Sequence, residues 1–164
     1  EPSKFVLNDI VHLNATIWPR ALLKEINGFR SELRTQQDIM LFIDAYAQGA
    51  SLIYVDAIVA RHLKNPNSTL QRKASWQHDL QALEVCWRAA QVLQPLEADL
   101  VAKKAVYHLR KLAMAGQTGR ALDAARRMRP LVRGNVWDQG GRLERTFART
   151  LGCGAALRYL AKRS

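Results

Sequence analysis

Asp38 lies in the segment GFRSELRTQQDIML, residues 28 to 41, close to the predicted start of an amphipathic helix. A carboxylate at this place has two uses. Thr35-Gln36-Gln37-Asp38 has the spacing of a capping box, in which the acid satisfies free backbone N–H groups of the first turn. The same carboxylate could instead act as a general base and take a proton from a substrate hydroxyl. The local residues leave both interpretations open.

Positive charge is concentrated in the C-terminal part of the chain. The net charge is +11, and residues 102 to 164 carry 15 Lys and Arg against three acidic residues. Such a field favours anionic lipid surfaces, acidic proteins or nucleic acid, although solvated helix faces account for most single charges. The residues expected to meet an anionic membrane or partner are Arg126, Arg127, Arg129, Arg142, Arg145 and Arg149. Nucleic acid is not expected as a partner, because the Gly and aromatic interleaving of known modules is missing.

Several classes of site are not indicated. Cys86 and Cys153 are far apart and have no second thiol at metal-ligand spacing, so no metal site or disulfide framework is predicted. No apolar run approaches the roughly 20 residues needed to span a bilayer. We therefore expect a cytoplasmic protein that could be peripheral at the inner face of the membrane.

The hydrophobic pattern changes its period near residue 70. Before that point, alternation in 11–18 and the β-branched run 51–59 predict short strands, with helices after Pro19 and after Thr35. After it, only helices are expected, and their ranges are 68–93, 95–115, 119–128 and 142–164. The predicted fold class is mainly α (α+β), with a small N-terminal β element of two or three strands followed by a helical bundle or hairpin array. Two regions are predicted, 1–70 and 71–164.

The first region resembles the acceptor-side half of the catalytic domain of family-two inverting glycosyltransferases, which have the GT-A fold. The matching positions are Gly28-Phe29, Leu33, Asp38, Leu41, Gly49, Tyr54-Val55, Ala60-Arg61 and Asn65-Pro66-Asn67-Ser68. The family usually has Gly-Gly-Phe-Asp-Glu, an acidic pair and a His-Pro-Gly-Ser-like turn. Here Asn27 replaces the first Gly, Gln37 the first acid and Asn65 the turn His, which indicates a diverged member.

The resemblance implies a role for four residues. Asp38 would be the catalytic base that deprotonates the acceptor hydroxyl as a nucleotide-activated sugar departs from the opposite face. Gln37, Arg61 and His62 would contact substrate, Arg61 by holding a phosphate or another anion. From the residues alone, an arginine such as Arg61 is more often a surface charge than a ligand, and a histidine such as His62 is more often a surface or satisfied side chain.

The resemblance also implies that the donor-binding half of the enzyme is missing from these residues. A GT-A enzyme binds its nucleotide sugar through an N-terminal half whose Asp-x-Asp motif holds Mg or Mn, and no Asp-x-Asp occurs in the chain. We therefore expect a C-terminal fragment of a longer glycosyltransferase that modifies a cell-surface glycan or lipid-linked acceptor, inactive alone and holding no cofactor itself. Without the parent sheet, its strands would pair in a hairpin or form a homodimer through an exposed edge.

A second interpretation concerns the helical region. Small and apolar residues recur at nearly the positions of one tetratricopeptide helix pair: Ala105, Leu109, Ala113, Gly116, Ala121, Ala125 and Pro130. The alternative function is therefore a helical protein-interaction module with a basic binding face. A plain helical hairpin explains the same pattern.

Overall fold

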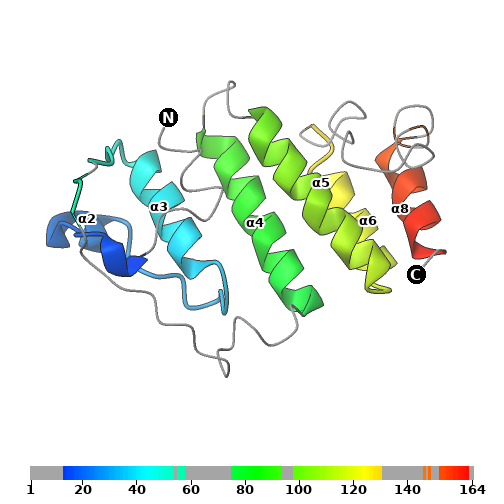
Figure 1. Cartoon of the computed structure of the whole chain (residues 1–164), viewed down its shortest axis with the longest axis horizontal. Helices are drawn as coiled ribbons and strands as arrows, with labels where there is room; N and C mark the ends of the chain where they lie inside the picture. The colour runs from blue at the N-terminus through cyan, green and yellow to red at the C-terminus, as the bar shows by residue number, and fades with distance from the viewer. Residues whose placement is uncertain are drawn as a thin grey trace.

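The structure is a computed structural model of the 164-residue chain. It describes residues 13–53, 55–57, 75–93, 98–130, 146, 148 and 152–162. The regular elements in these ranges are η1 (Leu13–Ala15), α2 (Arg20–Glu25), α3 (Gln37–Ala47), α4 (Trp76–Val92), α5 (Ala98–Met114), α6 (Thr118–Arg127) and α8 (Cys153–Ala161). Helices α3, α4 and α5 lie side by side, and α6 and α8 continue the array beyond them (Figure 1).

The predicted N-terminal β element is wrong. The segment predicted as a first strand contains the 3-10 turn η1, and residues 51–53 and 55–57 belong to no regular element, with no strand anywhere among the described residues. An isolated strand leaves its backbone N–H and C=O groups unpaired, so it is stable only beside a second strand. The apolar residues of the predicted strands are also not all buried, because Ile17 is 97% exposed and Ile53 is 81% exposed. The strand edge on which the predicted homodimer depended is therefore not found in the described part of the chain.

The two helices predicted in the first region are present. Pro19 precedes α2 with φ −62°, which suits a helix start, and Asn27 and Gly28 end the helix in the left-handed region. The Gly28 N–H donates to the Leu23 carbonyl at 2.8 Å, which satisfies a free carbonyl of the last turn. The chain then reaches α3, whose Phe42 packs against Trp18 with ring centroids 4.8 Å apart.

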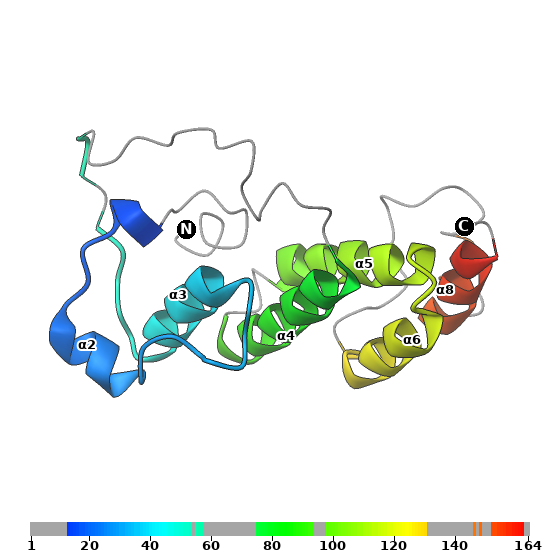
Figure 2. The same cartoon turned by 90° about the horizontal axis from the view of Figure 1, so that it is seen from below.

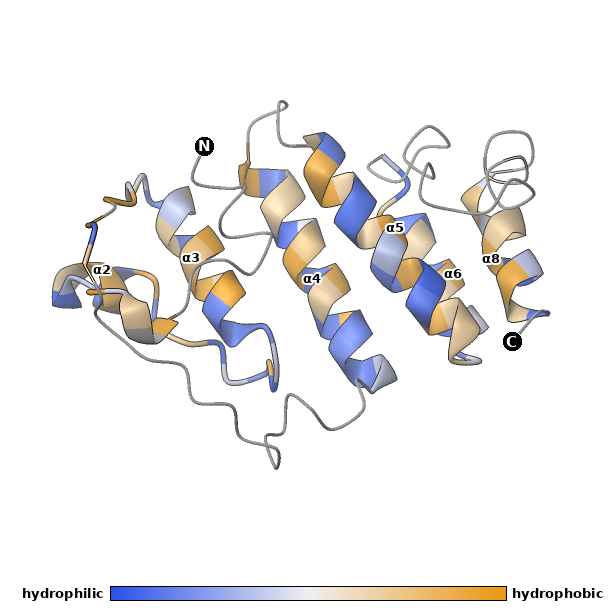
Figure 3. Cartoon of the chain, viewed as in Figure 1, coloured by the Kyte–Doolittle hydropathy of each residue, from blue (hydrophilic) through white to orange (hydrophobic). Residues whose placement is uncertain are grey.

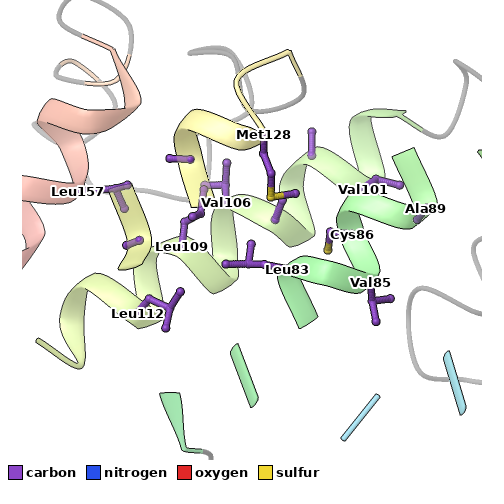
Figure 4. Packing of buried hydrophobic residues seen from close by; sticks show 14 of the residues in the cluster. Leu83, Val85, Cys86, Ala89, Val101, Val106, Leu109, Leu112, Met128 and Leu157 are labelled. Carbon is purple, nitrogen blue, oxygen red and sulfur yellow. The ribbon is translucent and has the colours of Figure 1, made fainter. Parts of the chain in front are cut away.

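Helices α4, α5, α6 and α8 form most of the core. Leu83 and Cys86 of α4 point toward Val106 and Leu109 of α5, and Leu157 of α8 reaches the same core (Figure 4). All the tetratricopeptide-like apolar positions on α5 and α6 are buried: Ala105, Leu109, Ala113, Ala121 and Ala125. Small side chains here let α5 and α6 approach closely.

Helices α4, α5, α6 and α8 carry apolar and polar residues in turn along their lengths (Figure 3), and their buried residues recur at helical spacing. In α3 the seven consecutive residues 39–45 are buried. Helix α8 packs against both α5 and α6, and α3 packs against α4. Seen at right angles, α6 lies beneath α5 with α8 at its end (Figure 2). Ile39, Met40 and Ile43 of α3 belong to the same core as α4 and α5, so the array extends across the predicted boundary near residue 70.

Candidate functional site

Asp38 lies in the first turn of α3, but the predicted capping box does not form. The residue before the helix is Gln36, with φ +63°, and it makes no side-chain cap. Thr35, the predicted cap, instead uses both its N–H and its hydroxyl to bond Gln81 Oε1 of α4. Asp38 Oδ1 accepts a hydrogen bond from the Ile39 N–H at 2.9 Å, so it satisfies one free amide of the helix start.

A hollow of about 300 Å³ opens beside Asp38. Its lining residues come from η1, the turn after α2 and the start of α3, and they are Leu13, Phe29, Arg34, Thr35, Gln36, Gln37 and Asp38. The structure thus brings together Phe29, Gln37 and Asp38, three of the positions that carry the resemblance or border it. Arg61 and His62 lie outside the described residues.

The functional groups of the side chains that line this hollow are one carboxylate, one guanidinium, amides and an aromatic ring. Gln37 Nε2 donates to the Leu33 carbonyl, so its amide oxygen is the end left for a ligand. The second oxygen of Asp38 accepts no hydrogen bond from another described residue. A half-buried carboxylate, one of whose oxygens has no partner among the described residues, can bind and deprotonate a hydroxyl group.

The predicted basic face of α6 is partly neutralised. Arg126 donates to Asp123 at 2.8 Å, and Arg127 donates to both oxygens of Glu84 at 2.7 and 3.1 Å. Arg129 is exposed, and no ion pair is found for it among the described residues. Paired guanidiniums attract a second anion less strongly than free ones, so charge counting overstates the field of α6. Arg142, Arg145 and Arg149 fall outside the residues that the structure describes.

A second hollow, of about 220 Å³, lies between α4 and α6. Its walls are mostly apolar, and they are formed by Leu80, Leu83, Glu84, Trp87, Ala124, Arg127 and Met128. The Arg127 guanidinium lies 5.3 Å from the Trp87 ring centroid, a cation–π contact. No sequence pattern indicates this hollow, because the residues of its two walls lie 43 positions apart, as Glu84 and Arg127 show.

The described cysteines are poor nucleophiles. Burial raises the pKa of the Cys86 thiol and of the Cys153 thiol to about 12. Both therefore stay protonated at neutral pH, whereas the thiolate is the reactive form. In the described ranges no group of three or more His, Cys, Asp and Glu side chains is placed to bind a metal ion. None of the described helices is both long and apolar enough to cross a lipid bilayer.

A buried polar pair joins α4 to α5. His108 Nδ1 lies 2.8 Å from Asp79 Oδ1, and the two residues are only 5% and 2% exposed. Lys111 Nζ lies 3.5 Å from the same carboxylate oxygen. Burial lowers the pKa of His108 below its usual range, against the opposing effect of Asp79, and nearby Lys104 and His78 act in the same direction as burial. The ring is therefore neutral at pH 7.

Because His108 of this pair is buried and neutral, we expect the fold to lose stability when the pH is lowered. In the unfolded chain His108 binds a proton below about pH 6.5, whereas in the folded protein its pKa is lower and the ring stays neutral. The free energy of unfolding is therefore highest above about pH 6.5 and decreases as the pH falls below that value. We expect His108→Asn to reduce this decline, because the Asn amide can still donate to Asp79 but does not titrate. The melting temperatures of the wild type and of His108→Asn at pH 7.5 and 5.5 measure this decline. An equal shift in melting temperature for both proteins would show that His108 is not responsible.

Comparison with protein-family models, with curated proteins and with solved structures gave no match for this chain. The features of the chain that bear on its function are the two hollows and the residue pattern around Asp38.

Proposed function

We propose that the segment around Asp38 forms the acceptor side of the active site of an inverting glycosyltransferase. The observation that supports this best is the hollow at the start of α3, which Phe29, Gln37 and Asp38 all line. One of the two Asp38 carboxylate oxygens accepts no hydrogen bond from another described residue. Phe29 and Asp38 match the glycosyltransferase pattern in the sequence, Gln37 stands where the pattern has its first acid, and all three line this one hollow.

Each group has a part in the proposed reaction. Asp38 accepts the proton of the acceptor hydroxyl as that oxygen attacks the sugar of a nucleotide-sugar donor. Phe29 offers a ring face on which a sugar can stack, and Gln37 offers an amide oxygen to a hydroxyl. Among the described residues no group of three or more His, Cys, Asp and Glu side chains is placed to hold a metal ion. The acceptor is a cell-surface glycan or a lipid-linked saccharide.

The test is a transfer assay on the complete protein that the source cell makes with these residues. The protein is incubated with nucleoside-diphosphate sugars, with membranes as a source of acceptor, and with Mg or Mn. We expect labelled sugar to enter the glycan fraction, and the 164-residue chain alone to transfer none. Absence of transfer with every donor by a protein that carries an Asp-x-Asp motif would overturn the proposal.

A second candidate function is a helical interaction module, and the hollow between α4 and α6 favours it. Helix α8 contacts both α5 and α6, as the first helix of a following repeat would. The hollow has mostly apolar walls and one ion pair, Arg127 with Glu84, and it borders the C-terminal part of the chain that carries most of the positive charge. Its partner would be an acidic peptide with apolar anchors, which complements both features.

Arg127→Gln tests this second candidate. We expect the affinity for a labelled acidic peptide containing Leu and Phe to fall about tenfold, because Arg127 lines the hollow and stacks on Trp87. Fluorescence anisotropy measures it. The control is Arg126→Gln, the same change of charge on the adjacent residue, which does not line the hollow. Equal effects of the two substitutions would show that the peptide responds only to net charge.

A further inference from the structure

Three hydrogen bonds from the loop before α3 meet on one oxygen atom of α4. Gln81 Oε1 accepts from the Arg34 N–H at 3.1 Å, from the Thr35 N–H at 2.7 Å and from the Thr35 hydroxyl at 2.8 Å. An amide oxygen has two lone pairs, so three donors saturate it. This is the point at which the helical region holds the loop of the candidate site.

The loop that Gln81 holds has a conformation that its own sequence does not favour. Gln36, the next residue, has φ +63°, a left-handed conformation that non-glycine residues rarely adopt. Such a conformation persists where the surroundings impose it. On the other side of the loop, Gln36 Nε2 lies 3.4 Å from His78 Nε2, and His78 is three residues before Gln81 on α4. One face of α4 therefore touches residues 34 to 36 in succession.

Asp38 lies close in the chain to the loop residues that Gln81 binds. Residues 34 to 38 all line the hollow, and Asp38 is only three residues after the anchored Thr35. A general base must lie within hydrogen-bond reach of the proton that it takes, and a shift of about 1 Å can lower a rate about a hundredfold.

We propose that Gln81 is a positioning residue: its amide oxygen fixes the loop 34–36 and so aims the Asp38 carboxylate into the hollow. The effect on catalysis depends on the glycosyltransferase function proposed above, while the fixing of the loop does not. Gln81 acts through the loop and does not line the hollow itself.

The test compares Gln81→Met with Gln81→Glu in the complete protein. Met has a similar shape but no strong acceptor, whereas Glu keeps an oxygen at the same place. For Gln81→Met we expect faster hydrogen exchange at the Thr35 amide and a kcat lowered about tenfold or more, with a smaller change in KM. For Gln81→Glu we expect both values to stay close to wild type. The matched control is Gln77→Met, the same change at an exposed position of α4.

Two results would overturn the proposal. One is an unchanged Thr35 exchange rate in Gln81→Met, which would show that the loop does not depend on Gln81. The other is faster exchange with an unchanged kcat, which would show that the loop does not aim Asp38. If the wild-type protein transfers no sugar, the proposed function fails instead, and the exchange rates still show whether Gln81 fixes the loop.

Discussion

Replacement of Asp38 by Asn is expected to lower the rate of sugar transfer by about 10²–10⁴-fold while the protein stays folded. Asn keeps a side-chain oxygen that can accept the Ile39 N–H, the one bond that Asp38 makes among the described residues. An amide oxygen, however, does not take up a proton near neutral pH. The substitution therefore separates the two uses of this residue, since it preserves the helix-end contact and removes the base.

The measurement is kcat in the complete protein, together with the free energy of unfolding. We expect stability to change by no more than about 1 kcal/mol, the size of a charge effect at a helix start. Glu32→Gln is the control, because it removes an exposed carboxylate close by in the chain that does not line the hollow. Equal kcat values for Asp38→Asn and wild type would leave Asp38 as a helix-end residue and make the interaction module the better account.

Most of the described helices could be predicted from the sequence because they depend on local signals. The exception is the single helix predicted for 142–164, because Gly152 has φ +85° and α8 begins only at Cys153. Pro19 and Gly28 delimit α2, and a 3.6-residue apolar period runs through α4 and α5. The strands could not be judged in this way, because a strand is stable only if another strand pairs with it. Residues 51–53 and 55–57 have suitable residue types and no partner in the described part of the chain.

The candidate site shows the same division between local and distant information. Asp38 and Gln37 were found because they follow one another in a motif. Gln81 was missed, since it lies 46 residues after Thr35 and no sequence period connects a loop to a glutamine on another helix. The predicted capping box failed for a related reason: Thr35 has the right spacing, but its N–H and hydroxyl both donate to Gln81 of α4, and Gln36 takes the place before the helix. Asp44 gave no signal either, although two distant arginines bond to it.

Replacement of Asp44 by Ala is expected to destabilise the fold by about 2–3 kcal/mol. Asp44 is 7% exposed and lies on α3, where Arg30 donates to both of its oxygens at 2.8 and 2.9 Å and Arg88 of α4 donates to Oδ1 at 3.0 Å. A hydrogen bond to a charged group contributes about 1.5–3 kcal/mol to stability. Removal of the Asp44 carboxylate also leaves the guanidiniums of Arg30 and Arg88 without this partner. The loss stays moderate because the side chains of Arg30 and Arg88 are 37% and 34% exposed and can regain water.

Urea denaturation measures this loss, and Glu84→Ala is the matched control. Glu84 also accepts two bonds from one arginine, but both partners of that pair are exposed, so we expect a loss below about 1 kcal/mol. Arg88→Met combined with Asp44→Ala should cost less than the sum of the two single changes, because the double variant no longer leaves Arg88 unpaired. If Asp44→Ala costs no more than Glu84→Ala, burial does not strengthen the Asp44 cluster. The contact between α3 and α4 would then depend on its apolar side chains alone.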